Sequence, residues 1–131
     1  MSFVLDTNTL IYFFKGMGAV AERLLAVSPS EVVVCAPVLF ELEVGLAKSS
    51  EPDKRRGQLN VLLDAVQFRA FGANEAHASA RIRAALEAVG HPIGPMDNLV
   101  AGSALAHGDI LVTRNLKEFG RIEGLLLENW Y

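Results

Sequence analysis

The chain has 131 residues, a length typical of one domain with its own hydrophobic core. Because 51% of the residues are hydrophobic and 21% are charged, we expect a globular chain, not a disordered one. The net charge of −3 disfavours a basic DNA-binding module, although it is compatible with an acidic site that contacts phosphate through a metal ion. No apolar run approaches the roughly 20 residues that cross a bilayer, and the start has no signal-peptide pattern. The single cysteine, Cys35, cannot form an internal disulfide, so these features together predict a cytoplasmic protein.

The apolar pattern predicts short strands that alternate with helices. Strands are expected over residues 3–5, 31–36, 67–71, 110–113 and 125–127. Helices are expected over residues 10–14, 19–27, 38–47, 54–66, 75–89 and 96–107, with a helical turn from 115 to 119. This alternation favours a mainly parallel sheet with helices on both faces. Because the chain contains no repeat or inter-domain linker, we expect a single domain.

Several residues are expected to shape these helices. Thr7 or Asn8 can cap the first helix, and Asn74 can cap the helix over residues 75–89. Apolar positions surround most of the helix over residues 38–47, so we expect that helix to be largely buried. Gly45, within it, should allow another backbone to approach closely.

Three acidic residues stand out by position. Asp6 directly follows the first strand, and a side chain at the carboxyl end of a strand in an α/β sheet faces the crevice where ligands bind. It could equally be an N-cap. Glu41 lies in the apolar helix with no basic residue one turn away, so its partner must be a distant arginine or lysine, or a cation. Asp97, in the first turn of the helix over residues 96–107, either joins a site or complements the helix dipole.

A divalent metal ion is an economical partner for clustered carboxylates, and their hard oxygen ligands suit Mg²⁺ or Mn²⁺. A zinc site is disfavoured because the histidines share no ligand spacing with Cys35; we expect them on the surface or in packing roles (His77, His91 and His107). The sequence contains no dinucleotide-binding glycine motif, phosphate-binding P-loop or nucleophile elbow. Asn8 replaces the second aspartate of aspartyl-phosphate phosphatases, which disfavours that class.

Five segments together resemble the PIN-domain family, and most closely the VapC-type toxins of bacterial toxin–antitoxin pairs. These segments are residues 3–8, Phe40-Glu41-Leu42 with Gly45, residues 94–101, residues 111–115 with Glu118 and Phe119, and residues 127–130. The resemblance covers the whole chain in the same order. It implies a three-layer α/β/α sandwich with a mainly parallel sheet, formed by one PIN domain over residues 1–131.

The resemblance also implies a metal-dependent endoribonuclease, with Asp6, Glu41 and Asp97 as the catalytic metal ligands. Mg²⁺ would be the cofactor, with Mn²⁺ as a possible substitute. Asn115 stands where the family often has a fourth acid, and an uncharged amide can orient a water or phosphate but binds Mg²⁺ more weakly. Glu118 could approach the site, but a place in a solvated helical turn is the first expectation. The residues expected to support the acids are Thr7, Asn8 and Thr113.

In such an enzyme, a metal-activated water would attack a phosphodiester of tRNA or of a ribosomal RNA loop, leaving a 5′-phosphate and a 3′-hydroxyl. The candidates for RNA backbone contacts are Arg114, Lys15, Arg81 and Arg83, and solvated helix faces explain each of them about as well. Relatives of this type form homodimers and are inhibited by a cognate VapB-type antitoxin. The apolar residues of the first helix suit an interface or the core (Leu10, Ile11, Phe13 and Phe14).

Two other functions remain open. A catalytically weak or inactive PIN-fold module would bind RNA or a protein partner without cutting, and Asn115 is the feature that favours it. A small phosphohydrolase would instead release inorganic phosphate from monoesters.

Overall fold

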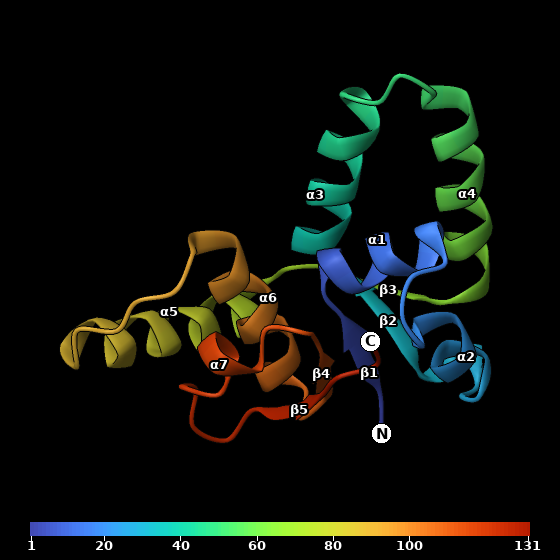
Figure 1. Ribbon diagram of the computed structural model, residues 1–131. Helices are drawn as coiled ribbons and strands as arrows, with labels where there is room; N and C mark the ends of the chain where they lie inside the picture. Colours follow the sequence, from blue (N-terminus) through green and yellow to red (C-terminus); the bar gives the residue numbers. More distant parts are fainter.

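The computed structural model describes residues 1–131 and contains one five-stranded sheet, in the order β3-β2-β1-β4-β5 (Figure 1). The strands are β1 (Phe3–Leu5), β2 (Val32–Cys35), β3 (Gln67–Arg69), β4 (Ile110–Val112) and β5 (Leu126–Glu128). All four neighbouring pairs are parallel. The five expected strands and the parallel sheet are therefore confirmed, and β1 occupies the centre.

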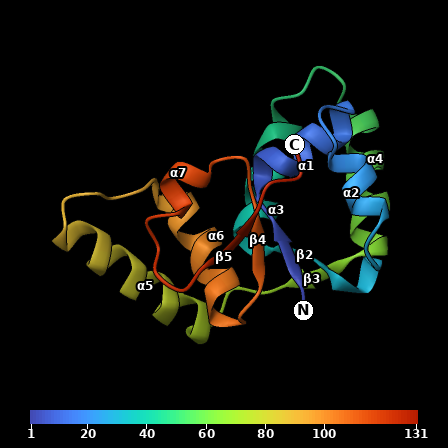
Figure 2. The same ribbon diagram turned by 60° about the horizontal axis from the view of Figure 1, so that its bottom comes forward.

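The helices flank this sheet. They are α1 (Thr7–Lys15), α2 (Val20–Leu25), α3 (Ala36–Ala47), α4 (Pro52–Ala65), α5 (Ala73–Ala88), α6 (Pro95–Ala106) and α7 (Leu116–Phe119), with a 3₁₀ turn, η1 (Pro29–Glu31). Figures 1 and 2 show α5, α6 and α7 on one side of the strands and α1, α2 and α4 on the other. This arrangement confirms the α/β sandwich. No helix combines the length and apolar character needed to span a membrane.

The central strands are buried on both faces, which explains why their apolar residues do not alternate with polar ones. Val4 and Leu5 of β1 and Leu111 and Val112 of β4 have no exposed surface. Trp130 is 2% exposed and packs on Phe3 with a ring-centroid separation of 5.3 Å. Packing in this core therefore fixes the positions of β1 and β4 and of the residues that directly follow them.

Two expected helix caps are wrong. Asp6, not Thr7 or Asn8, caps α1, because its Oδ1 accepts the Thr9 backbone N–H at 2.8 Å. Gly72, not Asn74, caps α5, which begins two residues earlier than expected. Glu75 explains the difference: its carboxylate accepts the Gly72 backbone N–H at 2.7 Å, as in the carboxylate half of a capping box.

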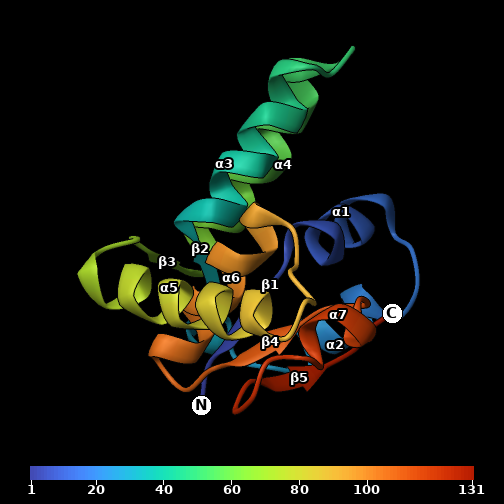
Figure 3. The ribbon, with the colours of Figure 1, turned by 90° about the vertical axis from the view of Figure 1, so that its left-hand side faces the viewer.

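The expectations for the helix over residues 38–47 are also wrong. The α3 helix is buried on one side only, since Phe40 is 59% exposed and Val44 and Gly45 are exposed as well. Figure 3 shows the reason: α3 and α4 run together beyond the sheet as a protruding pair. Nothing lies within 4 Å of the position that a Gly45 Cβ would occupy, so no backbone approaches this glycine closely.

The close helix contact occurs instead at Gly102 of α6, which packs against Ser79 of α5. A Cβ on Gly102 would lie 1.8 Å from the Ser79 Oγ and 2.8 Å from its Cα. Asn98 reinforces this contact by donating from its Nδ2 to the Ser79 carbonyl oxygen at 2.8 Å. Since Asn98 follows Asp97 directly, the α5–α6 contact also holds the first turn of α6 in place.

We expect Gly102→Ala to lower the free energy of unfolding by about 1–3 kcal/mol, because the new methyl group forces α5 and α6 apart at their buried contact. Gly57→Ala is the matched control: Gly57 is exposed on α4 with nothing within 4 Å of its Cβ position, so alanine should stabilise by about 0.5–1 kcal/mol. Urea denaturation followed by circular dichroism measures both values. Similar effects of the two substitutions would contradict the close packing of α5 on α6.

Candidate active site

Asp6, at the carboxyl end of the central strand, is fixed by two hydrogen bonds. Its Oδ1 caps α1, and its Oδ2 accepts the Thr113 hydroxyl at 2.6 Å. Asp6 is only 8% exposed, and Thr113 is fully buried. Because an ionised carboxylate has about four acceptor sites, these two bonds leave further lone pairs available. Asp6 is thus both a helix cap and a possible ligand.

Glu41 projects from α3 toward the start of α1. Its Oε1 accepts the Thr7 hydroxyl at 2.6 Å. No arginine or lysine forms an ion pair with Glu41, so of the two partners expected from the sequence, the distant basic residue is absent. Thr7 and Thr113 therefore have the same role: the Thr7 hydroxyl orients Glu41, and the Thr113 hydroxyl orients Asp6, each by a short hydrogen bond.

Asp97 lies in the first turn of α6, and its surroundings show that the acids gather there. Burial raises the pKa of Asp97, and the negative charges of Glu118, Glu41 and Asp6 raise it further. Three carboxylates from other parts of the chain thus disfavour the ionised form of Asp97. The structure brings together the three acids singled out from the sequence and adds Glu118.

Of the two placements expected for Glu118, the structure favours the one near the acidic site. Glu118 is partly buried on α7, and its Oε2 accepts the Asn115 Nδ2–H at 3.0 Å. Among the charged neighbours of Asp97 it has the largest effect on the pKa. The available signal was the spacing of Asn115 and Glu118, because residues three apart share one face of a helical turn.

Asn115 and Asn8 occupy the exposed rim. The Asn115 backbone N–H donates to the Thr113 Oγ1 at 3.0 Å, which links the rim to the buried hydroxyl that holds Asp6. Asn8 makes no side-chain hydrogen bond within the chain. Both asparagines line a small cavity of about 220 Å³ together with Asp6, Tyr12 and Arg114.

The four basic candidates separate into two groups. Arg114 borders the cavity at Asp6, with its guanidinium carbon 3.6 Å from the ring centroid of Tyr131. Lys15 borders a second cleft, which contains Glu41. Arg81 and Arg83 lie on α5, and neither lines a cavity that contains Asp6 or Glu41. Arg83 instead pairs with Glu87 at 3.3 Å.

The histidines and the cysteine lie outside this acidic group. His107 Nε2 is 2.8 Å from the Glu75 Oε2, while His77 and His91 are exposed. Hydrogen bonds from the Gly72 backbone and from His107 lower the pKa of Glu75. Burial raises the pKa of the Cys35 thiol. The histidines thus lie on the surface or in packing contacts, as expected from the sequence.

The chemistry of the acidic group fits a hard divalent cation. Its donors are carboxylate oxygens, which Mg²⁺ and Mn²⁺ prefer. As they stand, no three or more His, Cys, Asp or Glu side chains are close enough together to hold a metal ion. Burial and the nearby negative charges nevertheless raise the pKa of Asp97, so the ionised acids repel each other in this arrangement. A cation would offset this repulsion.

Comparisons with known proteins agree with the geometry. The PIN domain family profile matches residues 3–125. The chain is 32% identical to the tRNA(fMet)-specific endonuclease VapC of Shigella flexneri, over 99% of this chain and 98% of the relative. It is 34% identical to ribonuclease VapC2 of Rickettsia felis, with the same coverage.

Solved structures give the same result. The crystal structure of VapBC2 from Rickettsia felis, bound to a DNA fragment from their promoter, contains a chain that matches with a TM-score of 0.93 at 32% identity and 100% coverage of both chains. DNA-bound VapBC from Salmonella typhimurium also matches at 0.93 and 32%, over 100% of this chain and 99% of the other. The chain therefore belongs to the PIN-domain family, as a ribonuclease of the VapC type.

Proposed function

We propose that this protein is the toxin of a toxin–antitoxin pair and that it cuts RNA with a divalent metal ion held by Asp6, Glu41 and Asp97. The supporting observation is the electrostatic one: the acids form no ion pair with a basic residue, and burial together with the charges of Glu118, Glu41 and Asp6 raises the pKa of Asp97. Mg²⁺ is the expected ion, and Mn²⁺ the expected substitute.

When bound, the metal ion supplies Lewis-acid polarisation of the phosphodiester and lowers the pKa of a water. The chain's own residues orient the reaction. Thr113 and Thr7 fix the directions of Asp6 and Glu41, so these ligands lose little freedom on binding. Asn115 donates a hydrogen bond to Glu118 and holds it near Asp97. The Glu118 carboxylate thus supplies the negative charge that the family's fourth acid would carry and that Asn115 lacks. This placement weakens the case for a non-cutting binding module.

The substrate class that we propose is tRNA. The VapC relatives from Shigella flexneri and Salmonella typhimurium are both named as tRNA(fMet)-specific endonucleases. Arg114, stacked against Tyr131 and near Tyr12 beside Asp6, offers a cation and aromatic faces to a nucleotide. Since tRNA is cytoplasmic, we also propose that the protein acts in the cytoplasm.

The partner that we propose is a VapB-type antitoxin, because the matching solved structures are VapBC complexes. A mostly apolar groove of about 780 Å³ between α1, α2 and α4 offers room for a protein segment. Phe13 and Phe14 line this groove, whereas Leu10 is fully buried in the core.

The first test is cleavage of total tRNA by antitoxin-free protein with Mg²⁺, with Mn²⁺ and with EDTA. We expect metal-dependent fragments, a loss of at least about 100-fold in Asp97→Asn, and a loss of about 10- to 100-fold in Glu118→Gln. Glu123→Gln is the matched control, because Glu123 is exposed and makes no hydrogen bond. Cleavage in EDTA, or undiminished cleavage by Asp97→Asn, would contradict the proposal.

The raised pKa of Asp97 also predicts a pH dependence of stability. Between the unfolded and the folded pKa, the folded protein binds the proton more tightly, so the free energy of unfolding should fall as the pH rises through this window. The decline should disappear in Asp97→Asn, which should melt at a higher temperature than the wild type at neutral pH without metal.

Thermal melting in EDTA across a pH series measures this effect. Mg²⁺ should reduce the wild-type decline, because the ion offsets the repulsion at Asp97. Parallel pH curves for the wild type and Asp97→Asn would show that this carboxylate is not under repulsion.

A further inference from the structure

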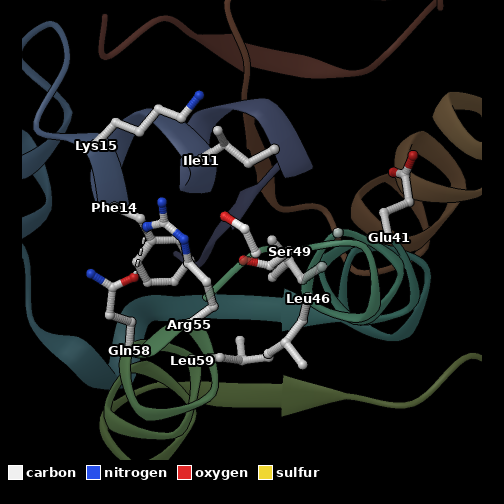
Figure 4. A pocket seen from close by; sticks show the side chains of 12 residues that line it. Ile11, Phe14, Lys15, Glu41, Leu46, Ser49, Arg55, Gln58 and Leu59 are labelled. Atoms are coloured by element: carbon white, nitrogen blue, oxygen red, sulfur yellow. Dashed lines mark hydrogen bonds between the residues drawn. The ribbon is translucent and has the colours of Figure 1, made fainter. Parts of the chain in front are cut away.

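A cleft of about 350 Å³ lies between α1, α3 and α4 and continues from the acidic site (Figure 4). Figure 4 shows Glu41 at one end of the cleft, Arg55 with Gln58 at the other, and Ser49 between them. We call this the Arg55 cleft; its lining also includes Ile11, Phe14, Lys15, Gly45, Leu46 and Leu59. Because Glu41 belongs to both, a ligand that reaches this end of the cleft contacts one of the proposed metal ligands.

Two cations in the cleft have no carboxylate partner. Arg55 is partly buried, and its only side-chain hydrogen bond is to the Gln58 Oε1 at 3.2 Å. Lys15 forms no ion pair. The neighbours of Arg55 on α4 are paired: Arg56 with both oxygens of Glu43, at 2.6 and 2.7 Å, and Lys54 with Glu51 at 3.9 Å.

Arg56 has a structural role that Arg55 lacks. The Arg56 hydrogen bonds lower the pKa of Glu43, and Glu43 raises that of Arg56, so this ion pair joins α3 to α4. Arg55, one residue earlier, points into the cleft and contributes nothing comparable to the helix pair. In a chain of net charge −3, two free cations beside an acidic site call for an anionic ligand.

The remaining lining suits one nucleotide. The Ser49 Oγ accepts the Glu51 backbone N–H at 3.0 Å, which leaves its own hydroxyl proton free to donate to a phosphate oxygen. Ile11, Phe14 and Leu46 provide apolar surface for a base or ribose. The volume matches a small-ligand pocket, whereas a protein segment would find more apolar room in the groove of about 780 Å³.

We propose that the Arg55 cleft binds the RNA nucleotide adjacent to the bond that is cut, with Arg55 and Lys15 contacting its phosphate. This inference rests on the proposed ribonuclease function. It assigns a role to Arg55, and it explains why Gly45 faces open space: a side chain there would occupy the cleft.

The experiment measures binding of fluorescently labelled total tRNA by anisotropy, in EDTA and at several salt concentrations, so that binding is separated from cleavage. Arg55→Gln and Lys15→Gln should each weaken binding about tenfold and reduce the slope of log K against log salt by about one. Lys54→Gln, an equal change of charge on the adjacent residue, should change neither quantity, because Lys54 lies outside the cleft.

A second pair of variants tests whether tRNA binding needs the open volume of the Arg55 cleft. Gly45 has no positive φ and no neighbour within 4 Å, so Gly45→Glu should fold normally and block the cleft, with at least a tenfold loss of tRNA binding. Asn60→Glu adds the same negative charge on an exposed face of α4, outside both the cleft and the groove of about 780 Å³, and should bind as the wild type does.

The outcomes are distinct. Wild-type tRNA affinity in Arg55→Gln and Gly45→Glu would overturn the inference, and so would equal losses in the variants and their controls. Unchanged tRNA binding with weakened binding of the purified antitoxin would assign the cleft to a protein, which also overturns it. Arg55-dependent tRNA binding without metal-dependent cleavage would instead contradict the ribonuclease function and leave the cleft as an RNA site.

Discussion

The structure depends on one carboxylate, that of Asp6, being held at the end of the central strand. Its two hydrogen bonds join three elements, because Thr9 belongs to α1 and Thr113 follows β4. The same bonds end β1, begin α1 and fix a negative charge at the carboxyl edge of the sheet. The local folding of the first ten residues and the electrostatics of the site are therefore one feature.

The grouping of acids around Asp6 lowers the stability of the fold without metal and creates a site for a cation. Glu41, Asp97 and Glu118 approach Asp6 from other elements, and their repulsion appears as the raised pKa of Asp97. The scaffold tolerates this because it is rigid elsewhere: α6 is held to α5 by Gly102 and Asn98, and Thr7 and Thr113 hold two of the acids. A cation bound at these acids would offset the repulsion between them.

The sequence predicted the sheet well, because strands buried on both faces give continuous apolar runs that have few other interpretations. It also brought Asp6, Glu41 and Asp97 to notice, since each is an acid at an unusual position. It left Glu118 undecided between the site and a solvated turn, because the approach of Glu118 to Asp97 depends on where the short α7 packs. It failed for Gly45 because helix periodicity reports which residues are apolar, and the protrusion of α3 beyond the sheet is a tertiary property.

Arg55 and Arg56 show why adjacent identical residues can serve different ends. Successive residues on a helix point about 100° apart, so Arg56 meets Glu43 on α3 while Arg55 faces the cleft with only Gln58 as a partner. The Arg56–Glu43 pair links α3 to α4, the two helices that form walls of the cleft. Since Glu41 borders both the cleft and the acids, an RNA phosphate in the cleft and a cation at the acids each reduce the electrostatic cost of the other. Substrate and metal binding should therefore be mutually favourable, and the protruding helix pair is the element that couples them.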